Sequence, residues 1–203
     1  DSPTNNFCTL NPLWSDATTI SEGNLKDVSS NAGATSSTMA VSSGKWYYEA
    51  LAVSNTSGNY WTFGVGNMDY NISSNRTAAQ PANDYVGSDD YTWGLYGVSG
   101  EKYHNGATVG SNLGSFTDGD IIGIAFDVDS NDMWFSKNGS WLEGDPAAGT
   151  GASFANVGLT PTNANVNGTI EPWIGSGSFA VTSVANFGQD SSFAGNKTAQ
   201  GNQ

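Results

Sequence analysis

The stretch DVDSND, which begins at Asp127, has residue types and a spacing that could bind a metal ion. Asp127, Asp129 and Asn131 stand at alternate positions, as oxygen ligands do at the start of a helix–loop–helix calcium loop. Such a loop also needs Gly at its sixth position and Glu at its twelfth, where this chain has Asp and Asn. Asp and Asn equally favour tight turns, because their side chains bond nearby backbone amides. We therefore predict a hairpin whose turn is Asp129–Asp132, and no metal site.

Residues that could catalyse a reaction are few. His104 is the single histidine and stands next to Asn105-Gly106, a turn signal, so a Ser-His-Asp triad would have to use it there. One histidine and one cysteine, Cys8, do not make a conventional zinc site. The carboxylates show no Glu-x-Asp-x-x-Glu pattern on one strand that would indicate a glycosidase. We predict that the chain is not an enzyme and needs no cofactor.

Composition sets the class of protein. The chain has 203 residues, 37% hydrophobic and 12% charged, with 26 glycines and a net charge of −13. That size suits one domain. The negative charge disfavours binding to nucleic acid and to anionic membranes, and no run reaches transmembrane length, so we expect no membrane insertion. A lone cysteine cannot form an internal disulfide, and stability must come from packing.

Short strands separated by Gly, Asn and Asp recur about every ten residues, and no helical stripe is present. In 45–53, Trp46, Tyr48, Ala50 and Ala52 fall on one face and Lys45, Tyr47, Glu49, Leu51 and Val53 on the other, which is the alternation of a strand. Residues 68–90 lack periodicity, and so long a loop in a compact domain is usually functional. These features predict an all-β sandwich.

The aromatic residues fall into two expected groups. Those within strand motifs are predicted to form the core: Trp46, Phe63, Phe126, Trp134, Phe135 and Phe187. Those in or beside loops are predicted to be exposed for binding, where Tyr and Trp give rigid amphipathic area, or else to cap the ends of the sandwich: Tyr60, Trp61, Tyr70, Tyr85, Tyr91, Trp93, Tyr96 and Tyr103.

Several segments in order resemble the SPRY domain family: GKWYYEALAV, YWTFGVGN, YG followed by KYHNG, GDIIGIAFDVDSNDMWFSKNGSW, GDPAAGT and NFGQ. The resemblance implies a bent, concanavalin-like sandwich of two antiparallel sheets that binds through loops and has no enzymatic activity. The segments WFSKNGSWLEGDPAAGT and SPTNNFCTLNPL look most like SPRY-containing structural proteins of tailed bacteriophages. We divide the chain into an N-terminal extension with a first hairpin (1–41), a SPRY-like sandwich (42–190) and a polar tail or linker (191–203).

The expected function is recognition by a structural protein of a virion, in an extracellular setting. The partner would be a protein or glycan on a host surface, or another virion protein. Two alternatives remain: a lectin-like carbohydrate-binding domain, and a purely architectural subunit, which could form a homo-oligomer. In the family, loops at one end of the sandwich make the ligand surface, and by position the candidates are Tyr70, Asn75, Arg76, Asp84, Tyr85, Tyr91, Trp93 and Tyr103.

Overall fold

The computed structural model describes residues 6–15, 18–67, 85–155 and 169–198. Within these ranges the regular structure is entirely β, and no helix is long and apolar enough to cross a membrane. The strands are β1 (Leu10–Ser15), β2 (Thr18–Ser21), β3 (Lys26–Ser37), β4 (Lys45–Asn55), β5 (Trp61–Asn67), β6 (Thr92–Tyr96), β7 (Glu101–His104), β8 (Ala107–Thr108), β9 (Ile121–Asp127), β10 (Asp132–Lys137), β11 (Ser140–Trp141) and β12 (Ile170–Asn186).

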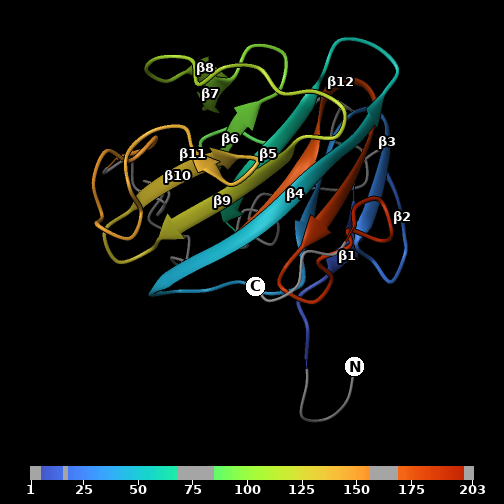
Figure 1. Ribbon diagram of the computed structural model, residues 1–203, viewed down its shortest axis with the longest axis horizontal. Helices are drawn as coiled ribbons and strands as arrows, with labels where there is room; N and C mark the ends of the chain where they lie inside the picture. The colour runs from blue at the N-terminus through green and yellow to red at the C-terminus, as the bar shows by residue number, and fades with distance from the viewer. Residues whose placement is uncertain (1–5, 16–17, 68–84, 156–168, 199–203) are drawn as a thin grey trace.

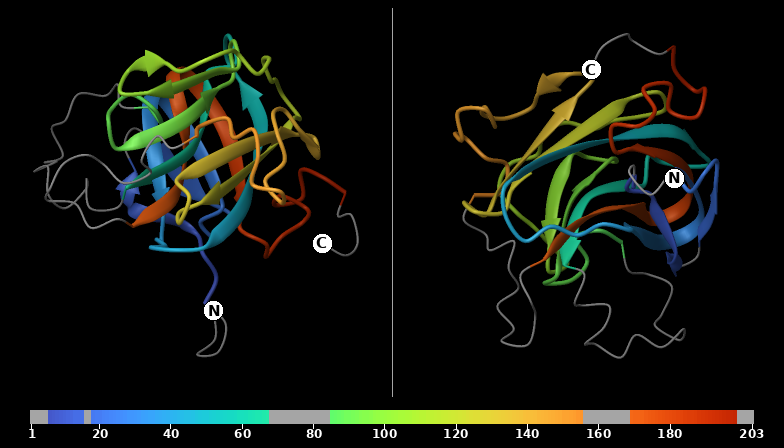
Figure 2. Two further views of the ribbon diagram at one scale, coloured as in Figure 1. Left: turned by 90° about the vertical axis from the view of Figure 1, so that its left-hand side faces the viewer. Right: turned by 90° about the horizontal axis from the view of Figure 1, so that it is seen from below.

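The strands form one antiparallel sheet, in the order β11-β10-β9-β4-β12-β5-β6-β7-β8, which curls into two layers (Figure 1). One layer holds β4, β9, β10 and β11, and the other holds β5, β6, β7 and β8. β3 pairs with β12, and both β1 and β2 pair with β3. The side and bottom views show the same curl (Figure 2). The predicted all-β, bent antiparallel sandwich is confirmed.

The 17-residue strand β12 joins the two layers. Its first part, Ile170–Ser176, pairs with β5, and its second part, Val181–Asn186, pairs with β4. The register with β3 shifts between Ser176 and Phe179, where a bulge lets the strand bend. β12 therefore leaves one layer and enters the other, which closes the sandwich along this side.

The main core lies between the layers. Apolar side chains that alternate along the strands point inward from both sides, and each of the following belongs to one buried cluster: Tyr48, Ala50, Ala52, Ile122, Ile124, Phe126 and Phe135 from one layer, with Trp61, Phe63, Val65, Trp93 and Leu95 from the other. The buried Trp61 keeps its indole N–H satisfied, since it donates to the carbonyl of Thr182 at 3.1 Å.

The stretch DVDSND is a hairpin turn, as predicted, although its boundaries differ by one residue. Asp127 pairs with Asp132, so residues 128–131 make the turn. The Asp127 carboxylate accepts hydrogen bonds from the amides of Asp129 (3.0 Å) and Ser130 (3.3 Å), and Asn131 adopts a positive φ of 60°. These hydrogen bonds hold the Asp127 carboxylate against the backbone of the turn.

Some predictions about single aromatic residues are wrong. Trp46, expected in the core, is 49% exposed, and it is the second residue of β4, at the end of the strand. Trp61 and Trp93, expected at loops, are fully buried. The loop signal came from their neighbours, whereas both residues lie in strands on the core-facing side.

Part of the segment predicted as a polar tail packs on the sandwich. Phe193 is buried with Leu25, Leu51 and Val184 in a second, smaller cluster on the outer side of β4 and β12. Lys197 adds a hydrogen bond of 2.6 Å to the carbonyl of Gly119. The residues up to 198 that the structure describes thus contribute to the fold. The proposed division into segments remains a prediction.

Candidate functional site

Five aromatic side chains gather on the outer face of the β12-β5-β6-β7 layer, and we call them the tyrosine cluster. They come from neighbouring parts of the sheet: one precedes β5, one precedes β6, one ends β6, one lies in β7 and one lies in β12. The members are Tyr60, Tyr85, Tyr96, Tyr103 and Phe179.

Strand register brings the cluster together. Tyr96 pairs with Glu101 across β6 and β7, and Tyr103 pairs with Gly94 two residues earlier in β6. Side chains two residues apart in a strand share a face, so Tyr96 and Tyr103 lie side by side. Their ring centroids are 5.5 Å apart in an edge-to-face arrangement. Tyr85 stacks on Tyr96 at 6.1 Å and meets Tyr103 edge-on at 5.8 Å.

The cluster continues onto β12. Tyr60 lies 5.9 Å from Tyr96 and 5.0 Å from Phe179, edge-to-face in both cases. A glycine makes this approach possible, because a Cβ on Gly177 would lie 2.6 Å from the ring of Tyr96. The amide of Gly177 also donates to the carbonyl of Tyr60 at 2.7 Å. Phe179 remains 47% exposed at the edge of the cluster.

One carboxylate sits among these rings. Glu101 Oε2 accepts hydrogen bonds from the hydroxyls of Ser99 (2.7 Å) and Tyr103 (3.2 Å). Burial, and then the charge of Glu101, raise the pKa values of Tyr85 and Tyr103. Burial and the neighbouring tyrosines raise the pKa of Tyr96 as well. The phenols therefore stay protonated at neutral pH, and that of Tyr103 donates to a negative acceptor.

The structure brings together two of the eight predicted site residues, Tyr85 and Tyr103. Tyr91 lies at the opposite end of β6 from Tyr96, where its carbonyl accepts from the amide of Asn67 at 2.9 Å. Trp93 points into the core, and its expected exposure is wrong. The remaining four lie outside the described residues: Tyr70, Asn75, Arg76 and Asp84.

Sequence reasoning missed Phe179 altogether and gave Tyr60 and Tyr96 only as aromatics near loops. The strand alternation in β6 carried a signal, since Thr92, Gly94 and Tyr96 share the face opposite Trp93 and Leu95. No local sequence pattern predicts that Phe179 joins the cluster, because its position depends on the bulge in β12.

The arrangement suits binding more than catalysis. His104 stacks on the buried Trp93 at 4.7 Å with 8° between the ring planes, and its Nδ1 lies 3.0 Å from the carbonyl of Thr92. The histidine is thus built into the sheet. In the described part of the chain no group of three His, Cys, Asp or Glu side chains is placed to hold a metal ion. What the tyrosine cluster offers is flat apolar area, phenol donors and one carboxylate.

The fold and the site together define an all-β sandwich with a half-buried aromatic cluster on one outer face. The sequence model of the SPRY domain family matches residues 45–190. The chain belongs to the SPRY domain family. SPRY domains are in general non-catalytic modules for protein–protein interaction.

Two relatives illustrate the likeness. The chain is 34% identical over 137 residues to the dual specificity protein kinase splA of Dictyostelium discoideum, an alignment that covers 66% of this chain and 5% of the kinase. It therefore spans a small part of that relative's length. Among solved structures, the SPRY domain of human HERC1 superposes with a TM-score of 0.65 at 19% identity, covering 89% of this chain and 99% of that one. This second likeness concerns the fold.

Proposed function

We propose that this SPRY domain is a non-enzymatic recognition module that binds a partner protein through the tyrosine cluster. The observation that carries the proposal is the convergence of five aromatic rings from different strands and connections on one outer face. Tyrosine is over-represented at interfaces because it combines apolar area with a polar end, and it often dominates the binding energy.

The cluster is organised before a partner arrives. Each ring contacts at least one other, and Tyr103 is further fixed by its bond to Glu101. Little rotamer entropy remains to be lost on binding, which favours affinity. The carboxylate would receive a donor from the partner, such as an amide or a cationic side chain.

The biological setting we propose is a structural protein of a tailed bacteriophage, acting outside the cell, with the partner on a host surface or elsewhere in the virion. Support for this comes from the resemblance of two sequence segments alone. The acidic charge of −13 is compatible with such a setting, since it keeps the domain soluble and away from nucleic acid.

The test is binding of the fluorescently labelled chain to intact candidate host bacteria and to immobilised virion proteins. The variant carries Tyr85→Ala and Tyr103→Ala, and the matched control carries Trp141→Ala, an exposed aromatic residue outside the cluster. Loss of binding by the double variant alone, with the unfolding midpoint retained, supports the proposal. Equal binding by all three proteins would remove the tyrosine cluster from the interface.

Treatment of the target cells separates the partner classes. Protease digestion of the cell surface should abolish binding if the partner is a protein. Loss after periodate oxidation of surface sugars, with no loss after protease, would instead favour the lectin-like alternative. Binding to no host and assembly into a closed oligomer that buries the cluster would favour the architectural one.

A further inference from the structure

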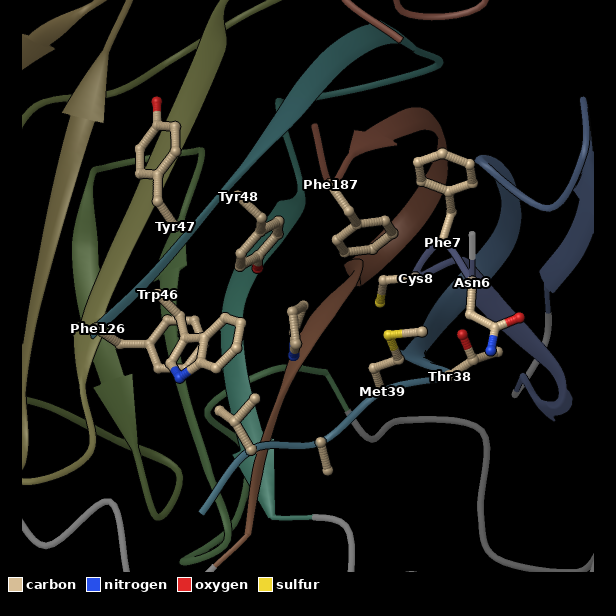
Figure 3. Close-up of a pocket in the computed structure, with 13 residues that line it drawn as sticks. Asn6, Phe7, Cys8, Thr38, Met39, Trp46, Tyr47, Tyr48, Phe126 and Phe187 are labelled. Atoms are coloured by element: carbon tan, nitrogen blue, oxygen red, sulfur yellow. The ribbon is translucent and has the colours of Figure 1, made fainter. Parts of the chain in front are cut away.

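A pocket of about 610 Å³ opens where β4 begins and β9 ends. Figure 3 shows Trp46 and Phe126 on one side of it, Phe7, Cys8 and Met39 on the other, and Tyr48 with Phe187 between them. The last two rings stack at 5.7 Å. The Tyr48 hydroxyl is held by the carbonyl of Gly64 and, at 3.1 Å, by that of Trp173. The pocket therefore has a rigid aromatic floor.

The rim of this pocket exposes large apolar side chains. Phe7 is 47% exposed, Met39 is 39% and Trp46 is 49%. The indole N–H of Trp46 donates to the carbonyl of Ser43 at 2.8 Å, so the ring is fixed in this exposed position. Apolar side chains gathered around a concavity mark a binding site far more often than ones scattered singly do.

All thirteen residues that line the pocket are uncharged at neutral pH. Burial raises the pKa of the Cys8 thiol, which stays protonated. Lys45 and Asp127 stand next in sequence to the lining residues Trp46 and Phe126, and they pair with each other at 3.7 Å. The cavity therefore has apolar walls and an ion pair beside its edge.

The charge of the whole chain is unbalanced. The chain has 19 acidic and 6 basic residues, and four of the lysines already bind acceptors of their own chain: Lys45 with Asp127, Lys102 with Glu143, Lys137 with Asp120, and Lys197 with the carbonyl of Gly119. A partner with positive charge is attracted, and one with negative charge is repelled. Exposed indole faces such as that of Trp46 also attract cations.

We propose that this pocket is a second binding site, which takes an aromatic or large aliphatic side chain of a partner polypeptide flanked by Lys or Arg. The apolar side chain fills the cavity between Trp46 and Met39. A flanking cation lies over the exposed ring of Trp46. The volume suits this occupant, since the pocket is within the usual range of ligand sites and larger than one side chain.

The second site is separate from the tyrosine cluster. Trp46 is the second residue of β4, and Tyr60 follows the end of that strand. The ten residues from Trp46 to Asn55 span roughly 30 Å when extended, and the two sites share no residue. The inference does not depend on the proposed function, and either could fail alone.

The probe is the blocked pentapeptide acetyl-Gly-Lys-Trp-Lys-Gly-amide, titrated into the full chain and followed by calorimetry and by amide chemical shifts. Two reference peptides are used. One has Glu in place of both Lys residues, and the other has Ala in place of Trp. We expect the first peptide to bind with a dissociation constant on the order of 100 µM, to weaken as salt is added, and to shift amides near Met39. Each reference peptide should bind at least about five-fold more weakly.

Two protein variants locate the site. Phe7→Ala and Met39→Gln change the exposed rim and should each weaken the peptide at least about five-fold. Phe179→Ala is the matched control, because Phe179 is as exposed as Phe7 but belongs to the tyrosine cluster, and it should leave affinity unchanged. No binding, equal binding by the Glu-containing peptide, or a loss confined to Phe179→Ala would each overturn the proposal.

Discussion

Thr35 donates a hydrogen bond of 2.9 Å to Asp27, although both residues lie in β3 and are eight positions apart. In a straight strand their Cα atoms would be separated by about 26 Å. The bond is possible because β3 bends where its partner β12 bulges. Thr18 of β2 joins the same group through a 2.9 Å contact with the Thr35 hydroxyl. The buried carboxyl of Asp27 thus links two parts of β3 across the bend between the two layers.

Burial of Asp27 makes stability depend on pH. Burial raises its pKa to about 6 from 3.8, against the lowering effect of the hydrogen bonds from Thr35 and Thr18. The folded protein therefore binds this proton more tightly than the unfolded chain does. The stabilising contribution is complete below about pH 4 and is lost as the pH rises through about 6. We expect Asp27→Asn to raise the free energy of unfolding at pH 8 by about 1–3 kcal/mol and to flatten its slope from pH 4 to 7.

Urea unfolding at a series of pH values measures how the free energy of unfolding depends on pH. Asp190 supplies a control of opposite sign, because hydrogen bonds from Ser192 and Ala194 lower its pKa. Asp190→Asn should reduce stability at neutral pH and have little effect in acid. If Asp27→Asn leaves the slope between pH 4 and 7 unchanged, the Asp27 carboxyl does not titrate in that range.

The close approach of two neighbouring strands requires a glycine at position 64. A Cβ at this position would lie 1.9 Å from the carbonyl oxygen of Trp93, in the adjacent strand. The backbones of β5 and β6 would have to separate, so Gly64→Ala should destabilise the fold by about 3 kcal/mol or more. Gly139→Ala is the comparison, because Gly139 has a φ of 80° and nothing within 4 Å. It should cost about 1 kcal/mol. Thermal unfolding that ranks the two variants the other way would contradict this account.

Lys102 is 5% exposed and binds Glu143 at 3.0 Å. Removing the acid leaves a buried cation without its counter-charge, whereas removing the lysine leaves a carboxylate that is one-third exposed. We expect Glu143→Gln to destabilise by about 1–3 kcal/mol, and Lys102→Met to cost less or be neutral. Chemical denaturation of both variants at low and high salt checks this order. A larger cost for Lys102→Met would show that the lysine contributes mainly through its packed methylenes.

Tyrosine ionisation reports on the cluster when the wild type is compared with a variant of Glu101. The pKa values of Tyr85, Tyr96 and Tyr103 are all raised, mainly by burial. At about pH 10 the folded protein should show less phenolate absorbance than the same protein in urea, and stability should fall as the pH rises further. Glu101→Gln should lower the midpoint of the folded-state titration, because its charge contributes to the shifts. A midpoint that does not move would exclude that electrostatic contribution.

The sequence predicted the fold well and the site poorly, for physical reasons. Strand alternation and Asn-Gly turns are local, so the hairpin at Lys137–Ser140, with positive φ at Asn138 and Gly139, could be read from neighbouring residues. The tyrosine cluster depends on pairing between strands distant in the chain. Tyr60 and Phe179 meet only because β12 returns beside β5. The lining of the pocket near Met39 likewise comes from segments far apart in the chain, so no local periodicity predicts it.

The position of β12 in the chain also sets when the domain can fold during synthesis. β12 is the last strand made, and it pairs with β3, β4 and β5, all of which precede it by more than a hundred residues. Until it leaves the ribosome, those three strands expose edges and apolar faces that other chains could pair with. Folding of this domain on the ribosome therefore waits for its C-terminal strand, and nascent chains stalled before Ile170 should need a chaperone to stay in solution.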